Sequence, residues 1–210
     1  MSRFALVDPR ETSIGTLYDL MVAAVQPRPI GFVSTLSPEG VRNLAPFSFF
    51  MAGGVNPPSL VYCPSRNRRG MPKDSEHNAE ATGQFVVNVV DRAMADAMNQ
   101  TGFDYAPEVD EWTVSGLTPA PCVRVRPERV LESPVAFECE VFHVVRHGEG
   151  PHATVYVIGE VLCAHVREDL WNEGRPDATA FRLIGRLGGA EYVDLAAPEI
   201  FTLPRPSVGK

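Results

Sequence analysis

Hydrophobic positions recur along this chain at two spacings, which predict many short strands and few helices. Between residues 12 and 25, apolar side chains follow a helical period that Thr12 or Ser13 caps and Pro27 ends. Short apolar runs between turn-forming residues are typical of strands. Such runs lie at 30–36, 41–50, 59–63, 84–90, 135–145 and 154–166. The last two are separated by Gly-Glu-Gly-Pro and are expected to form a hairpin of long strands.

Two further helices and one irregular segment complete the pattern. Asp74 or Ser75 is expected to cap a helix that ends before Gly83, a residue suited to the left-handed conformation that follows many helices. Residues 92–100 form the next predicted helix. Residues 104–121 are rich in turn formers and predict an excursion over the surface. Many strands with few helices favour a β-barrel over a parallel α/β sheet.

The clearest departure from a regular strand pattern lies within residues 28–50. The first strand there starts apolar and ends in two hydroxyls, Ser34 and Thr35, and a Ser-Pro-Glu-Gly turn follows. Pro46 then interrupts the second strand. Because proline offers no N–H to a sheet, it marks an edge, a bulge or a place where something other than a strand lies alongside. Phenylalanines around Ser48 suggest a flat, apolar partner that also carries polar groups.

Composition narrows the class of protein. The chain has 210 residues, a length that usually makes one domain, and its 44% hydrophobic content allows a real core. Nineteen prolines and seventeen glycines indicate many turns, in keeping with short strands. The formal charge of −7 argues against nucleic acid, which requires a basic face.

The sequence gives little indication of a membrane-spanning segment or of a disulfide framework. The chain has no run near the ~18 apolar residues of a membrane helix, and it does not start like a signal peptide, so we expect a cytoplasmic protein. Cys63, Cys122, Cys139 and Cys163 are widely spaced, which predicts buried thiols instead of a disulfide or zinc framework.

A dense basic patch precedes the predicted helix at residue 74. Arg66, Arg68 and Arg69 crowd one loop of an otherwise acidic chain. A solvated run of charges is the usual explanation for such a cluster. Here the cluster stands beside a helix start, where free N–H groups favour phosphate, so an anion site is the better interpretation. The sequence does not decide which arginine meets the anion, and another could receive the phosphate of a nicotinamide nucleotide.

Two other patterns carry no predicted chemistry. His143, His147, His152 and His165 could gather on the long hairpin, but no cysteine or carboxylate stands at ligand spacing, so we predict no metal site. Residues 185–189 lack the spacing and setting of a dinucleotide-binding fingerprint.

The motifs of this chain resemble those of the flavin reductase-like family. Arg-Pro-Ile-Gly-Phe-Val-Ser-Thr begins at Arg28, and Asn-Leu-Ala-Pro-Phe-Ser-Phe-Phe begins at Asn43. Pro-Lys-Asp-Ser begins at Pro72 and Gly-Gly-Ala-Glu-Tyr at Gly188. The resemblance is specific between Arg28 and Gly83 and loose in the middle of the chain.

The resemblance implies a fold and a set of cofactor-binding residues. The fold is mainly β, an FMN-binding split β-barrel of Greek-key type with a few short peripheral helices. It would form a single domain over residues 1–210, with a barrel core at about 25–190, the helix at 12–25 and a tail at 195–210. Ser75 stands where threonine is commoner, and its hydroxyl is kept. The implied site residues are Phe32, Val33, Ser34, Thr35, Asn43, Ala45, Pro46, Phe47, Ser48, Phe49, Arg66, Lys73, Asp74 and Ser75.

The resemblance also implies an activity, namely an FMN-dependent NAD(P)H:flavin oxidoreductase. FMN is favoured over FAD, and the choice between NADH and NADPH is open. No catalytic side chain is required, because the flavin carries the redox chemistry. Members commonly form homodimers with the site at the subunit interface, and pass reduced flavin to a partner oxygenase or reduce a substrate. Two alternatives stay open: an FMN-binding electron-transfer protein, and an enzyme that reduces an organic substrate with residues 104–121 as a lid.

Overall fold

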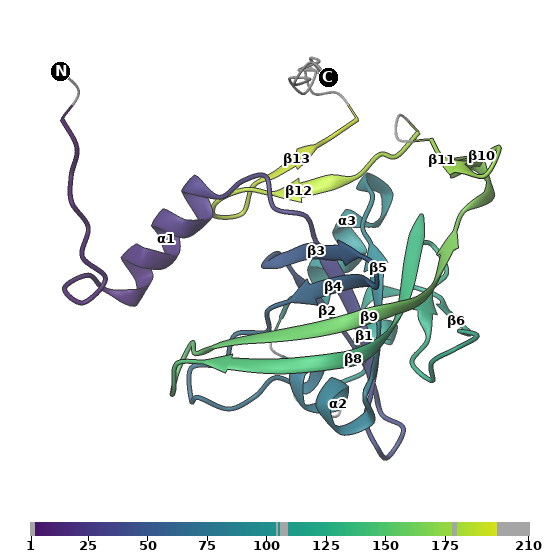
Figure 1. Ribbon diagram of the computed structural model, residues 1–210, viewed down its shortest axis with the longest axis horizontal. Coiled ribbons are helices and arrows are strands. Elements are labelled where there is room, and N and C mark those ends of the chain that lie inside the picture. The colour runs from purple at the N-terminus through teal and green to yellow at the C-terminus, as the bar shows by residue number, and fades with distance from the viewer. Residues whose placement is uncertain (1–2, 104, 106–108, 178–179, 197–210) are drawn as a thin grey trace, which may run out of the picture.

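Seven antiparallel strands form the main sheet of this protein. The computed structural model describes residues 3–103, 105, 109–177 and 180–196 (Figure 1). The sheet has the strand order β2-β1-β5-β8-β9-β4-β3. The strands are β1 (Gly31–Leu36), β2 (Arg42–Phe47), β3 (Phe50–Val55), β4 (Pro58–Tyr62), β5 (Gln84–Val89), β8 (Val135–His147) and β9 (Thr154–Val166). The prediction of a mainly β protein is confirmed.

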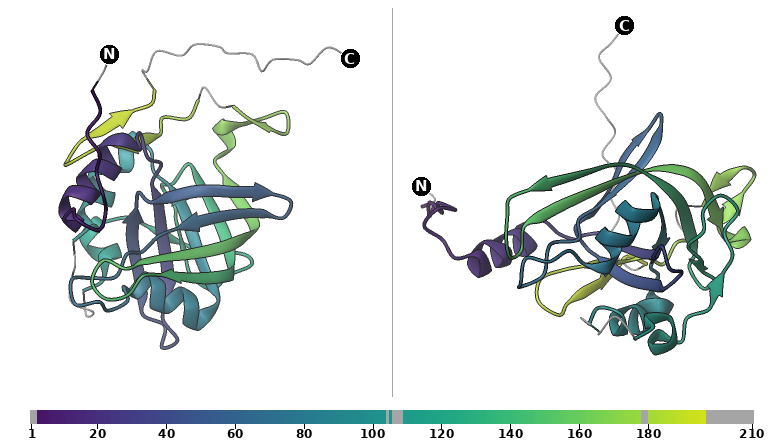
Figure 2. Two further views of the ribbon diagram at one scale, coloured as in Figure 1. Left: turned by 60° about the vertical axis from the view of Figure 1, so that its left-hand side comes forward. Right: turned by 90° about the horizontal axis from the view of Figure 1, so that it is seen from below.

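The sheet closes on itself because its two outermost strands are neighbours in the sequence. Strand β2 ends at Phe47 and β3 begins at Phe50, although they stand at opposite ends of the strand order. A link this short forces the sheet to curl until the end of β2 lies next to the start of β3, although the two strands do not pair (Figure 2). The strand predicted at 41–50 is present as β2, which pairs with β1 but ends at Phe47. Its last predicted residue, Phe50, instead begins β3, which pairs with β4.

The interior of the curled sheet is filled by aromatic and branched side chains. Tyr62 and Phe85 are fully buried there, with ring centroids 5.2 Å apart. Gly159 of β9 makes room for this packing, since a Cβ at its position would lie 2.2 Å from Cζ of Phe85. The buried residues of this core are Val33, Phe47, Leu60, Tyr62, Ala79, Phe85, Val87, Cys139, Val155 and Val157.

Helix α2 (Asp74–Thr82) lies across one open end of the barrel, as the right-hand view of Figure 2 shows. It ends as predicted, with Gly83 in the left-handed conformation at φ 72°. Its start differs from the prediction. The N-cap residue is Lys73, so Asp74 and Ser75 belong to the first turn and neither caps the helix. No side chain in the described part of the chain caps this helix start.

A second core lies outside the barrel, under short helices. The predicted helix at 92–100 divides into η1 (Arg92–Met94) and α3 (Ala95–Gln100). Helix α4 (Glu111–Ser115) follows, and then β6 (Pro119–Ala120) and β7 (Arg129–Val130) form a small ladder. Trp112 and Leu117 are buried in this core beside Phe32 of β1. The described part of the 104–121 segment is therefore more than a surface excursion, because it contributes core side chains.

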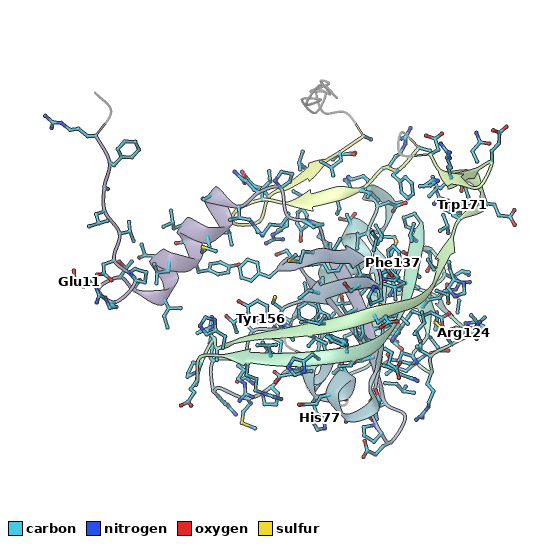
Figure 3. All side chains as sticks on the ribbon, viewed as in Figure 1. Glu11, His77, Arg124, Phe137, Tyr156 and Trp171 are labelled. Carbon is cyan, nitrogen blue, oxygen red and sulfur yellow. The ribbon has the colours of Figure 1, made fainter. Side chains whose placement is uncertain are left out.

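The first helix of the chain stands outside the barrel. Helix α1 (Ile14–Ala24) is capped by Ser13, whose hydroxyl accepts from the Thr16 N–H, and it projects from the body (Figure 1). Figure 3 shows its side chains surrounded by few others. Only Val22 of this helix is buried. The remaining elements are η2 (Glu168–Leu170), β10 (Trp171–Asn172), β11 (Arg175–Pro176), β12 (Ile184–Arg186) and β13 (Tyr192–Asp194).

Two predictions remain, one about the C-terminal tail and one about membrane-spanning segments. Most of the predicted tail, 195–210, lies outside the described residues. Across the described ranges, no helix is long and apolar enough to cross a membrane.

Candidate functional site

A cavity of about 280 Å³ lies between the edge strand β2, the start of α2 and the loop after α3. Its walls bring together two predicted motifs that are some thirty positions apart in the sequence. The predicted site residues that line it are Asn43, Ala45, Pro46, Phe47, Lys73, Asp74 and Ser75. These residues meet because α2 packs against β1 and β2 at this end of the barrel.

A buried polar network lies beside the cavity. The Asn43 amide donates to the Thr35 hydroxyl at 3.2 Å and to the Ser75 hydroxyl at 3.1 Å. The Asn78 amide donates to the same Thr35 oxygen at 3.3 Å. All four side chains are buried, so these hydrogen bonds hold their orientation in a region without competing water. The network fixes the start of α2 relative to β1 and β2.

The start of α2 offers the features of an anion site. The first N–H groups of a helix have no partner within the helix, and here no described side chain caps them. The positive end of the helix dipole and the Ser75 hydroxyl point to the same region. Tyr62, fully buried in the barrel, donates its hydroxyl to the Ser75 carbonyl at 2.9 Å and anchors this turn.

Pro46 stands where the cavity meets a second one. The neighbouring cavity, of about 320 Å³, shares Pro46 and Gly102 with the first and adds the predicted residue Ser48. Strand β2 is an edge of the sheet order, so the absence of an N–H at Pro46 breaks no ladder there. Of the three explanations that the sequence offered for this proline, the structure therefore supports a position on an edge strand. One side of that strand is open to a ligand.

Other predicted site residues point their side chains elsewhere. Phe32 and Val33 are fully buried in the outer core and the barrel core, respectively. The Ser34 hydroxyl donates to the Glu128 carbonyl at 2.6 Å. The Phe49 ring lies 6.4 Å from that of Tyr18, on the side of α1. None of these four residues lines the first cavity.

Arg66 is likewise turned away from the cavity. Its Nη1 donates to the Gly70 carbonyl at 3.1 Å, and its Nη2 lies 3.5 Å from Oε1 of Glu76. The described residues that line the cavity include neither Arg66 nor Arg68 nor Arg69. Among the described lining residues, Lys73 is the one with a positively charged side chain.

Several lining residues were missed by the sequence reasoning. They are Asn67, Pro72, Thr101, Gly102, Phe103, Tyr105 and Glu111. Burial raises the pKa of Glu111, and hydrogen bonds to the backbone, including that of Leu44, act in the opposite direction. Pro72 begins the motif at 72–75 but was not assigned to the site, and Asn67 lies on the loop before it. The other five residues carry no local pattern, since they reach the cavity through the packing of α3 and α4 on β2.

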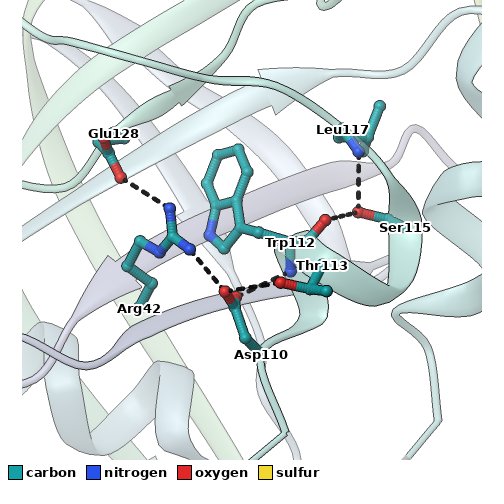
Figure 4. Close-up of polar contacts among 7 residues, drawn as sticks. All are labelled: Arg42, Asp110, Trp112, Thr113, Ser115, Leu117 and Glu128. Carbon is teal, nitrogen blue, oxygen red and sulfur yellow. Dashed lines mark hydrogen bonds and ion pairs between the residues drawn. The ribbon is translucent and has the colours of Figure 1, made fainter.

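An ion-pair network holds α4 beside the cavity (Figure 4). Arg42 of β2 lies 2.5 Å from the Asp110 carboxylate and 3.6 Å from that of Glu128. Asp110 also caps α4 by accepting from the Trp112 N–H at 3.1 Å. This arrangement ties the element that carries Glu111 to the strand that carries Asn43 and Pro46.

The tertiary structure also gathers three potential metal ligands that the sequence reasoning did not connect. Ligand atoms of Cys122, Glu138 and His165 lie within 4.8 Å of one another. The Glu138 carboxylate, however, already accepts from the N–H groups of residues 123–125 and lies 2.5 Å from Nε2 of His165. With its acceptor positions used in this way, Glu138 serves as a hydrogen-bonded clamp between β8, β9 and the loop at 122–125.

Comparison with known proteins places these features in a wider context. Residues 24–179 match the family described as "Flavin reductase like domain". The chain is 37% identical over 206 residues to the uncharacterized protein BH2278 of Halalkalibacterium halodurans, covering 97% of this chain and 98% of that one.

Two solved structures are similar over nearly the whole chain. Nitrilotriacetate monooxygenase component B from Bacillus cereus has a TM-score of 0.90 and 32% identity, covering 97% of this chain and 100% of that one. The 2-nitrobenzoate 2-nitroreductase NbaA of Pseudomonas fluorescens has a TM-score of 0.85 and 30% identity, covering 98% and 100%. The predicted split-barrel fold is confirmed.

Proposed function

This chain belongs to the flavin reductase-like domain family, and from that premise we propose that it is an FMN-dependent oxidoreductase of the NAD(P)H:flavin reductase type. One observation carries the proposal. A single cavity joins the Ala45–Pro46 edge of the barrel to the uncapped start of α2. An apolar strand edge with few hydrogen-bond donors, beside a helix start suited to an anion, supports binding of a flat ring with a phosphate tail.

The residues present fit such a cofactor. Lys73, the Ser75 hydroxyl and the first N–H groups of α2 would hold the phosphate, and the Ala45–Pro46 backbone would lie against the ring. Bound flavin supplies the hydride chemistry. The chain's own part is to bind, to orient and to exclude water, which the buried network around Asn43 supports by keeping this wall rigid.

The acidic residues near the proposed phosphate site support FMN over FAD as the cofactor. The adjoining cavity beyond Asn43 adds Glu39 to Asp74 and Glu111, which line both cavities. The arginine of that cavity, Arg42, is already paired with two carboxylates. A second phosphate and an adenosine would meet this acidic surface, and like charges repel.

A homodimer is part of the proposal. Helix α1 exposes Ile14, Tyr18 and Met21 by more than half of their side-chain surface. An isolated helix of this length is marginal in water, so a covering partner would stabilise it. We expect a second copy of the chain to provide that cover, which the molar mass in solution would test. A cytoplasmic location stays a prediction.

The acceptor of the electrons is proposed from the neighbours. One is by name a component of a monooxygenase, which supports transfer of reduced flavin to a partner oxygenase. The other is by name a nitroreductase, and the second cavity beside Pro46 would give an organic substrate access to the same ring. Direct reduction of such a substrate is therefore the second candidate function.

A visible absorption spectrum of the purified protein with FMN tests the proposal. Flavin bands that bleach quickly after anaerobic addition of NADH or NADPH are expected, and would name the donor. Bands that persist with both donors but bleach with dithionite would favour a flavin-holding electron carrier. Failure to bind FMN or FAD at all would overturn the proposed function.

A further inference from the structure

Glu76 is a buried carboxylate that lacks the partners such a group needs. Its side chain is 1% exposed, and neither carboxylate oxygen has a hydrogen-bond partner. It occupies the third position of α2, where a glutamate often bonds back to the N-cap residue in a capping box. That motif requires Ser or Thr at the N-cap, and α2 has Lys73 there. The Glu76 carboxylate turns into the protein instead.

Two arginines lie near this carboxylate at the edge of ion-pair distance. Nη2 of Arg66 and Nη2 of Arg146 are each 3.5 Å from Oε1 of Glu76. Arg146 is also paired at 2.6 Å with Glu80, so its charge is balanced elsewhere. Across the described residues, Glu76 is the one carboxylate within ion-pair distance of Arg66. Burial strengthens this attraction because little water screens it.

The pair lies next to the proposed phosphate site, but neither Arg66 nor Glu76 is among the described residues that line its cavity. Asn67 and Pro72, on the same loop as Arg66, line the cavity, and so does Ser75, the neighbour of Glu76. The Arg66 side chain is 26% exposed and long, so a change of rotamer can turn its guanidinium toward another anion. Without Glu76, a phosphate at the start of α2 would be available to it.

We propose that Glu76 holds the Arg66 guanidinium away from the anion site at the start of α2 and thereby weakens that site for a phosphate monoester. The proposal rests on the proposed function, in which this site takes the flavin phosphate. Weak binding has a purpose in a protein that hands reduced flavin to a partner, because release must be fast. The negative charge of Glu76 in the first turn of α2 acts in the same direction by repelling the phosphate.

Binding of FMN and of riboflavin, which lacks the phosphate, tests the proposal. In Glu76→Gln the FMN affinity is expected to rise roughly tenfold, the effect of one added charge-assisted hydrogen bond, with riboflavin affinity unchanged. The double variant Glu76→Gln/Arg66→Gln is expected to lose most of that gain. Glu80→Gln is the matched control, since Glu80 lies one turn later on α2 and pairs with Arg146 but not with Arg66. It should leave both affinities as in the unmodified protein.

The outcomes separate the two proposals. If the unmodified protein binds FMN no better than riboflavin, the phosphate assignment fails, and the role of Glu76 falls with it. If FMN is preferred but Glu76→Gln binds it equally or more weakly, the role of Glu76 alone is overturned. Should Glu76→Gln fold poorly, Glu76→Met provides an uncharged replacement of similar size for a buried ion pair, with the same expected gain.

Discussion

The Arg28 guanidinium donates from Nη2 to the carbonyl oxygen of Leu187 at 2.9 Å, a contact between residues 159 positions apart. Its Nη1 donates to the carbonyls of Val22 and Val25 at 2.8 and 2.9 Å. Arg28 is 4% exposed, and burial is the main cause that lowers its pKa. One buried side chain therefore joins the end of α1 to the β12–β13 ladder, and through Tyr18 and Tyr192 these elements wall the second cavity.

Arg28→Lys is expected to destabilise the protein although it keeps the charge. The single ammonium group of a lysine cannot reach the carbonyls at the end of α1 and the Leu187 carbonyl at once, as the planar guanidinium does. We expect the free energy of unfolding to fall by about 2 kcal/mol, the scale of one or two lost charge-assisted bonds. Chemical denaturation measures the loss. Arg10→Lys, at an exposed arginine that contacts Asp8, is the control, and an equal effect of both changes would contradict this role.

Lys73→Ala is expected to weaken FMN binding without affecting riboflavin. The lysine stands at the N-cap of α2 and lines the cavity, so its charge should act on the phosphate of FMN and not on the ring that both flavins share. The loss should be about tenfold, the scale of one charge-assisted contact. Fluorescence titration with the two flavins measures it. An equal loss for both would place Lys73 against the ring or the ribityl chain.

Pro46→Gly tests the contact between the flavin ring and the edge strand. The change frees the backbone at the junction of the two cavities and adds an N–H on the open side of β2. We expect a shifted flavin absorption band and an affinity about fivefold lower, the scale of 1 kcal/mol. Pro38→Gly, in the exposed turn between β1 and β2, is the matched control. An unaltered spectrum and affinity in Pro46→Gly would remove this strand edge from the ring site.

The hydrogen-bonded Glu138 carboxylate is expected to make the free energy of unfolding fall at acid pH. Burial raises the pKa of this carboxyl, but the hydrogen bonds from His165 and from the N–H groups of residues 123–125 outweigh burial and lower it to about 2. A pKa below the unfolded value stabilises the fold above the unfolded pKa, and the stabilisation disappears as pH falls through the folded value. Between pH 4.5 and pH 2, the loss should be on the order of 3 kcal/mol.

Glu138→Gln is expected to be less stable at neutral pH and to lose this part of the acid dependence. Unfolding free energies at several pH values measure both effects. Glu140→Gln, at an exposed position on the same strand, should keep the acid dependence of the unmodified protein. If Glu138→Gln keeps it as well, another group is responsible.

Local features of the structure follow from local sequence patterns. The helix ending at Gly83 and the long hairpin of β8 and β9 were predicted because period, capping and turn chemistry act within a few residues. The motifs at Arg28 and Asn43 also identified the family, since they are contiguous stretches. The cofactor assignment of individual residues stays a prediction.

Contacts between elements that are far apart in the sequence could be known only from the tertiary structure. The sequence alone determined the β class and most of the main elements, because the hydrophobic period is a property of the chain itself, whereas the position of Pro46 on an edge strand came from the strand order. Only the tertiary structure decided that Glu111 reaches the cavity, that Arg66 turns to Glu76 and that Glu138 meets His165. Glu111 and Glu138 reach their neighbours through the packing of separate elements, and Arg66 reaches Glu76 through the path of the loop before α2. None of these arrangements follows from the spacing of residues along the sequence.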